Sequence, residues 1–212
     1  LTDLKEKYLK NKQINSVEEK LKLNIVKNKK YIITSAQNGT PVNKLFLKSL
    51  LSYAAHNNAE LVVIPYRYKN PTSVWSTESK EKDWWDVSIR PYLMESEFKI
   101  GKYIRIMGNV KIQPTAVSPL SGFDTVTGLD SAIFGHPNVE QKTIASAPGK
   151  SPKILATTGT VTIPNYTDSK AGHKGSFHHV YSAAIVEIDG DETFHLRHIT
   201  ANDITGEFYD LA

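Results

Sequence analysis

The chain has 212 residues, enough for one large domain or two small ones, and its apolar fraction of 40% favours a folded core over a disordered chain. It contains no cysteine, which excludes disulfides, thiolate metal ligands and a cysteine nucleophile. No run approaches the ~18 apolar residues of a transmembrane helix, and the chain opens with no secretory signal sequence. We therefore expect a cytoplasmic protein without a membrane partner.

The positive charge of the chain is concentrated at its start. Residues 1–31 hold nine Lys against four Asp or Glu, a local charge of +5, whereas the whole chain carries +4. Leu4 and Tyr8 share one face of a predicted helix. We expect residues 1–29 to form a basic helical arm, which either touches phosphate groups or lies solvated beside its domain. Residues 30–212 are predicted to form a single α/β domain.

A βαβ unit is predicted at the start of this domain. Residues 30–37 (KYIITSAQ) and 60–66 (ELVVIPY) are apolar and β-branched at their centres, as buried strands are. Between them, apolar side chains recur at helical spacing over residues 42–57, and Pro41 suits the first turn of that helix. A strand, a helix and a strand in so short a stretch favour a parallel sheet, in which ligands bind beyond the carboxyl ends of the strands.

The loop after the second of these strands is basic. Residues 67–73 combine Arg67 and Lys69 with an aromatic side chain and two hydroxyl groups, a mixture that suits an anionic ligand. A solvated basic loop is the alternative. The adjacent indoles of Trp84 and Trp85 cannot share one face, so one is expected to anchor the loop and the other to face a partner or to pack structurally.

Further strands are predicted over residues 103–107, 132–136 and 153–158. The second of these delivers His136 to a loop. Residues 160–163 are also strand-like and lead into a long polar stretch.

The clearest local signal is a β-hairpin near the end of the chain. Residues 181–188 and 192–199 alternate apolar and polar side chains around Asp189-Gly190, a pair typical of a type I′ turn. His195 and His198 then lie on opposite faces of the second strand and cannot act together.

The most polar stretch is residues 164–179 (PNYTDSKAGHKGSFHH), which holds three of the seven histidines of the chain, His173, His178 and His179. Loops held between rigid elements often carry chemistry. Asp168 with His178 is a candidate acid–base pair, although His178 and His179 would point in opposite directions on an extended segment. A polar surface loop without a site is the alternative.

Anion binding is the role that we favour for this stretch. Lys170, His173 and Lys174 are candidate ligand or phosphate contacts. If the sheet is parallel, residues 67–73 and His136 should converge with them on one crevice beyond the strand ends. His136 is therefore a further candidate anion contact.

Established metal and nucleotide motifs are absent from the sequence. No P-loop, G-x-G-x-x-G or D-x-H occurs. A two-metal phosphoesterase site needs Asp, His and Asn clustered at strand ends, and the chain offers only Gly108-Asn109 and the stretch 135–138 (GHPN). No metal ligand and no cofactor are predicted in this chain.

Three segments nevertheless resemble the N-terminal region of large tailed-phage proteins in which a calcineurin-like metallophosphoesterase domain follows. The segments begin YIITSAQNGTPV, KIQPTAVSPL and PKILATTGTVTIP, and the likeness covers roughly residues 30–210. The resemblance is to relatives of an early siphophage protein that degrades host DNA. It implies that a divalent metal, Mn or Mg, is bound in a following domain, that nucleic acid is a partner, and that the host cytoplasm is the location.

Three functions remain open, in this order. The first is an accessory domain of a phage phosphoesterase or nuclease, which contacts DNA or assembles the protein as a homo-oligomer. The second is a self-contained hydrolase with its site at residues 164–179. The third is an oligomerisation module without a site, for which the near-neutral bulk of the chain is weak support.

Overall fold

The computed structural model describes residues 29–68, 84–146, 148–149, 152–190 and 192–211. The predicted basic arm over residues 1–29 lies outside this part of the chain except for Lys29, and so does Lys69 of the predicted basic loop. Among the helices in the described ranges, none is long and apolar enough to cross a membrane.

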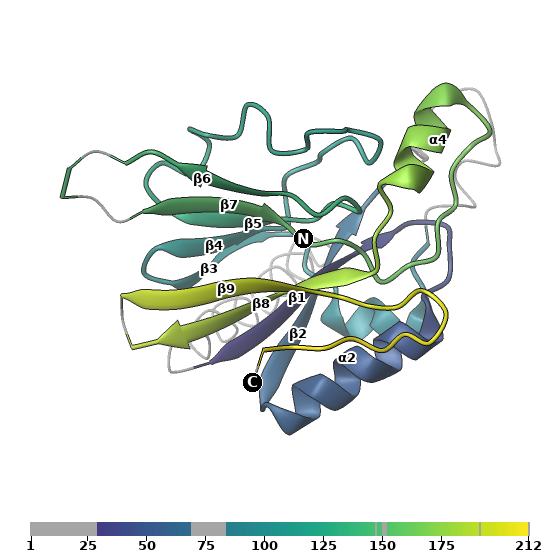
Figure 1. Ribbon diagram of the computed structural model, residues 1–212, viewed down its shortest axis with the longest axis horizontal. Helices are drawn as coiled ribbons and strands as arrows, with labels where there is room; N and C mark the ends of the chain where they lie inside the picture. Colours follow the sequence, from purple (N-terminus) through teal and green to yellow (C-terminus); the bar gives the residue numbers. More distant parts are fainter. Residues whose placement is uncertain (1–28, 69–83, 147, 150–151, 191, 212) are drawn as a thin grey trace, which may run out of the picture.

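The described strands form two mixed sheets (Figure 1). The first sheet has, in spatial order, β2 (Ala59–Tyr66), β1 (Lys30–Gln37), β8 (Ser182–Asp189) and β9 (Thr193–Thr200). The second has β3 (Glu97–Gly101), β4 (Ile104–Met107), β5 (Ser131–Phe134), β7 (Lys153–Thr157) and β6 (Gln141–Ile144). The pairs β1–β2, β4–β5 and β5–β7 are parallel, and the other pairs are antiparallel.

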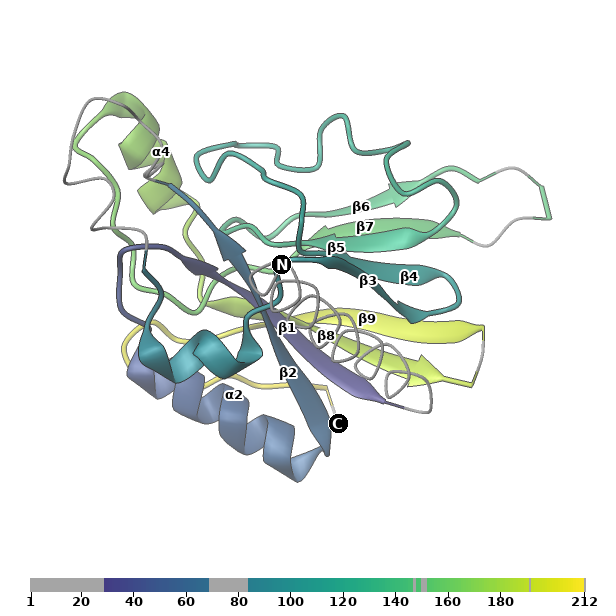
Figure 2. The same ribbon diagram turned by 180° about the vertical axis from the view of Figure 1, so that it is seen from behind.

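The sheets pack face to face in a layered sandwich, and the helix α2 (Lys44–His56) covers the outer face of the first sheet (Figures 1 and 2). Side chains of β1 pack alternately into two hydrophobic cores, because successive side chains of a strand point to opposite faces of the sheet. Tyr31 and Ile33 join the core between the sheets, whereas Ile32 joins the core under α2. The predicted α/β sandwich with a mixed sheet, a βαβ unit and a C-terminal hairpin is confirmed.

The helix of the βαβ unit begins two residues later than predicted. Asn43 is its N-cap, and the Asn43 side chain accepts a hydrogen bond of 3.1 Å from the Phe46 N–H. Val42 instead forms a β-bridge with Thr162. Pro41 therefore precedes the helix, and the expectation that it occupies the first turn is wrong.

Two strands and one 3₁₀ helix were not predicted. The strands β3 and β6 lie at the two edges of the second sheet, where polar side chains are tolerated and the apolar signal is weak. The 3₁₀ helix η1 (Val87–Tyr92) begins at Asp86, whose carboxylate accepts from the Ser88 N–H at 3.0 Å. Residues 160–163 form isolated bridges and not a strand.

The hairpin β8–β9 is present, but its turn is longer than predicted. Asp189 pairs with Thr193, which leaves three residues between the strands and excludes a two-residue type I′ turn. Gly190 has a φ of 66°, so this glycine does supply the left-handed backbone that the Asp-Gly pair predicted. His195 and His198 lie three residues apart on β9 and hence on opposite faces, as expected.

The predicted polar loop contains a helix, α4 (Lys170–Phe177), so that prediction is wrong for eight of its residues. Ser169 caps the helix by accepting a hydrogen bond of 3.0 Å from the Gly172 N–H. Two glycines lower the helix propensity and concealed the element. Both are required by packing, because a Cβ at Gly172 would overlap the Thr167 carbonyl and one at Gly175 would lie 2.8 Å from the Tyr166 ring.

Candidate functional site

The carboxyl ends of β1 and β2 meet the polar segment that leads into α4. The Tyr68 hydroxyl lies 2.7 Å from Thr167 Oγ1, and the rings of Tyr68 and Tyr166 are 4.9 Å apart between centroids. At the end of β1, Gln37 Nε2 donates to the Asn165 carbonyl at 3.0 Å. Segments far apart in the sequence thus come together at the edge where ligands bind in parallel sheets.

Beneath this edge lies a buried layer of neutral hydroxyl groups. Thr160 Oγ1 donates to the Ser35 carbonyl at 3.0 Å and lies 2.9 Å from Thr162 Oγ1. Thr162 Oγ1 in turn accepts from the Gln37 N–H at 2.9 Å. Tyr66 is buried above them, and burial raises the pKa of its phenol to about 12. The sequence analysis missed this layer, although the alternating threonines of residues 157–162 (TTGTVT) were a visible signal.

His136 is part of the core and not of an open crevice. It is fully buried, its Nδ1 accepts from the Asn138 N–H at 3.0 Å, and its Nε2 donates to the Gln113 carbonyl at 3.1 Å. Burial lowers the pKa of His136 to about 4, which keeps the ring neutral. With both nitrogens engaged and no positive charge, this geometry argues against the predicted role of His136 as an anion contact.

His179 has the same arrangement at the end of α4. The Tyr166 hydroxyl lies 2.9 Å from His179 Nδ1, and His179 Nε2 lies 2.7 Å from the Thr162 carbonyl, to which it donates. Burial lowers the pKa of His179 to about 4. The ring therefore ties α4 to the hydroxyl layer and holds Tyr166 in place.

The two predicted acid–base residues have different partners. Asp168 Oδ1 lies 2.9 Å from His173 Nε2, and both side chains are exposed, by 96% and 73%. His178 is the C-cap of α4, and its ring packs edge-on against Phe177 with 5.1 Å between centroids. Within the described part of the chain, Asp168 therefore pairs with His173 and not with His178. Catalysis by Asp168 and His178 stays a prediction.

The predicted cations fall into two groups. Lys170 and Lys174 are exposed and one turn apart on α4, with Lys170 in the first position of the helix. Arg67 instead stacks over the Trp85 ring, with its guanidinium carbon 4.6 Å from the centroid. Lys69 lies outside the described residues. The lysine pair on α4 and the exposed His173 are the described part of the predicted anion site that is open to solvent.

Gly108-Asn109 and residues 135–138, the two weak metal motifs of the sequence, have structural roles. A Cβ at Gly108 would lie 2.5 Å from the Met94 carbonyl oxygen, so only glycine fits the turn after β4. Asn138 donates from its backbone to His136 and from its side chain to the Val117 carbonyl at 3.1 Å. Within the described ranges, no three His, Asp or Glu side chains gather closely enough to hold a metal ion.

Comparison with known proteins found one informative relative. Protein A1 of Escherichia phage T5 is 33% identical over 187 residues, which cover 86% of this chain and 34% of that protein. The chain is similar to a phage protein. It spans about a third of that relative's length. The predicted resemblance to a phage protein is confirmed by this sequence similarity.

No family model matches the chain. Among solved structures, Vps29 of Chaetomium thermophilum aligns over 85% of this chain and 94% of its own, with 9% identity and a TM-score of 0.41. At that TM-score the likeness supports no conclusion about function.

Proposed function

We propose that this chain is an accessory domain of a phage metallophosphoesterase or nuclease, and that it contacts DNA through the face formed by α4 and the carboxyl ends of β1 and β2. The observation that carries the proposal is the similarity to phage T5 Protein A1 over 86% of the chain. The sequence resemblance to phage metallophosphoesterase proteins adds the class of activity. The proposal assigns the divalent metal, Mn or Mg, to the remainder of the parent protein.

The chemistry of the α4 face supports contact with phosphate groups. Lys170 and Lys174 present two ammonium groups to solvent on one side of the helix. Lys170 also lies at the positive end of the helix dipole, where a cation adds to an existing positive potential. Tyr68 and Tyr166 fix the segment before α4 on the sheet edge, so the two cations are held on a rigid support.

DNA binding by the purified chain, measured at several salt concentrations, tests this proposal. Each lost phosphate contact lowers the slope of log affinity against log salt by about 0.9. We expect Lys170→Glu with Lys174→Glu to weaken duplex binding for all sequences and to reduce the slope by about 2.

The matched control is Lys44→Glu with Lys48→Glu. These lysines occupy in α2 the same helical positions, first and fifth, that Lys170 and Lys174 occupy in α4. The control should bind DNA like the unmodified chain. DNA affinity that does not depend on salt, or equal losses in both variants, would contradict the proposed DNA face.

Assembly is the second candidate, as a homo-oligomer in the host cytoplasm. Phe177 at the end of α4 and Ile204 in the C-terminal segment are large apolar side chains with 84% and 77% of their surface exposed. Sedimentation of the chain at increasing concentration tests this function, and Phe177→Asp should abolish any self-association. A monomer at all concentrations would exclude it for this chain.

A further inference from the structure

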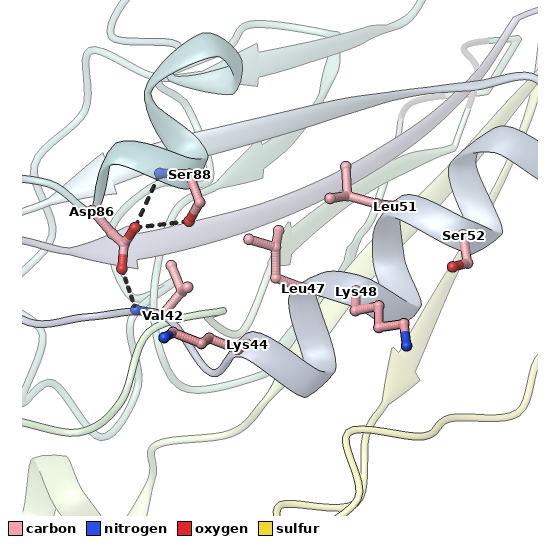
Figure 3. Close-up of a pocket in the computed structure, with 8 residues that line it drawn as sticks. All are labelled: Val42, Lys44, Leu47, Lys48, Leu51, Ser52, Asp86 and Ser88. Atoms are coloured by element: carbon pink, nitrogen blue, oxygen red, sulfur yellow. Dashed lines mark hydrogen bonds between the residues drawn. The ribbon is translucent and has the colours of Figure 1, made fainter.

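A groove of about 350 Å³ runs beside α2 (Figure 3). Its floor is apolar: Val42 and Leu47 are buried beneath it, and Leu51 is partly exposed in it. Leu47 and Leu51 project from α2 towards the segment that carries Asp86 and Ser88, which forms the facing wall (Figure 3). The volume is within the range of ligand sites in proteins.

The side of the groove formed by α2 is a regular helical stripe. The lining residues on this helix are Lys44, Leu47, Lys48, Leu51 and Ser52. Their spacing of three and four residues places them along one face, with the leucines inward and the other three exposed on the rim. Such a ridge of side chains is the surface against which a second helix packs.

Positively charged side chains outnumber negatively charged ones around the groove. Lys44 and Lys48 make no ion pair with any other described residue. The acid of the opposite wall is Asp86, whose oxygens accept from the Val42 N–H at 3.2 Å, the Ser88 N–H at 3.0 Å and the Ser88 hydroxyl at 2.8 Å. Asp86 keeps its own negative charge on the facing wall, so the two lysines outnumber this one carboxylate and the groove carries a net positive charge over an apolar floor.

We propose that this groove binds an acidic amphipathic helix of a partner protein. Apolar side chains of that helix would contact Leu47, Leu51 and Val42, and its carboxylates would meet Lys44 and Lys48 on the rim. Charge complementarity selects an acidic partner over a neutral one. None of the residues that line the groove is among those proposed to contact DNA, so this inference does not depend on DNA binding.

The test is fluorescence anisotropy with a labelled helical peptide of about four turns, with Leu at i, i+4 and i+7 and Glu at the flanking positions. The full 212-residue chain should bind it saturably. Lys44→Glu with Lys48→Glu should weaken binding about tenfold, because two attractive contacts become repulsive. Lys170→Glu with Lys174→Glu is the matched control and should leave the affinity unchanged.

A second variant guards against an indirect effect on folding. Ser52→Trp places a large ring at an exposed position of the rim and should block the peptide without altering any charge. Thermal unfolding of each variant checks that the fold persists. Unchanged peptide binding in both groove variants overturns the proposal.

Two other occupants are distinguishable in the same assays. If dodecanoate binds and the peptide does not, the groove takes a small amphiphile and the proposal is wrong. If the chain itself dimerises, and Lys44→Glu with Lys48→Glu abolishes the dimer, the occupant is a second copy and the proposal is equally wrong.

Discussion

The protein should lose stability steeply as the pH falls from about 6.5 to about 4, because histidines that are neutral and wholly or partly buried in the folded state accept protons when the chain unfolds. The pKa of His136 and that of His179 are each lowered from 6.5 to about 4 by burial. In the unfolded chain both take up a proton near pH 6.5, whereas in the folded protein they resist until about pH 4. The unfolded state therefore binds more protons throughout this window, and stability falls with falling pH.

The magnitude follows from the two pKa values. A pKa lowered from 6.5 to about 4 corresponds to about 3 kcal/mol per histidine, fully present above pH 6.5 and lost by pH 4. Two histidines give a total comparable with the whole stability of many domains. Burial also lowers the pKa of His198, whose Nε2 donates to the Thr157 carbonyl at 2.6 Å and links β9 to β7, so it should add to the loss.

Urea unfolding at several pH values between 7 and 4.5 is the appropriate assay. His136→Gln removes one of the titrating groups and should flatten the dependence of the unfolding free energy on pH, at the cost of lower stability at pH 7. His195→Gln, on the exposed side of β9, is the control and should leave the slope unchanged. A stability that is constant from pH 7 to pH 5, or an unaltered slope in His136→Gln, would refute the argument.

Three further predictions concern single contacts; the first two are measured by urea unfolding at pH 7 and the third by limited proteolysis. Gly172→Ala should lower the free energy of unfolding by about 1–3 kcal/mol despite alanine's higher helix propensity, because its Cβ would overlap the Thr167 carbonyl. An increase in the free energy of unfolding would show that the Thr167 backbone moves aside and would contradict this prediction. Lys153→Met should cost about 2–3 kcal/mol, because Lys153 Nζ donates to two carbonyls at 2.7 and 2.8 Å. Arg197→Met should free the C-terminal segment, whose Asp210 it binds, and increase its proteolysis; an unchanged cleavage rate would contradict this.

The strands and helix of the first βαβ unit were predictable because they carry complete local signals. β1 and β2 match their predicted spans to within one residue, and the hairpin β8–β9 is where alternation placed it. Buried parallel strands are continuously apolar, which makes them readable without an alignment. The edge strands β3 and β6 lack that signal, because half of their side chains face solvent.

The candidate site was predictable only in its location. The meeting of the 164–179 segment with residues beyond β2 follows from the rule for parallel strand ends, and the contacts of Tyr68 with Tyr166 and Thr167 agree with it. Which histidine lies in the core depends on neighbours distant in the sequence. His136 is satisfied by Gln113 and Asn138, and nothing in the local sequence indicates this.

The sequence by itself determined the α/β class, the parallel βαβ unit, the hairpin and the likeness to a phage protein, because each depends on patterns within one stretch of chain. The tertiary structure decided the helical state of α4, the neutral state of His136 and His179, and the groove beside α2. The glycines of α4 fit against the backbone and ring of earlier residues, and burial lowers the pKa of the two histidines. The groove forms because α2 and the segment around Asp86 supply its opposite walls. Such contacts join residues far apart in the sequence, and only the folded chain brings them together.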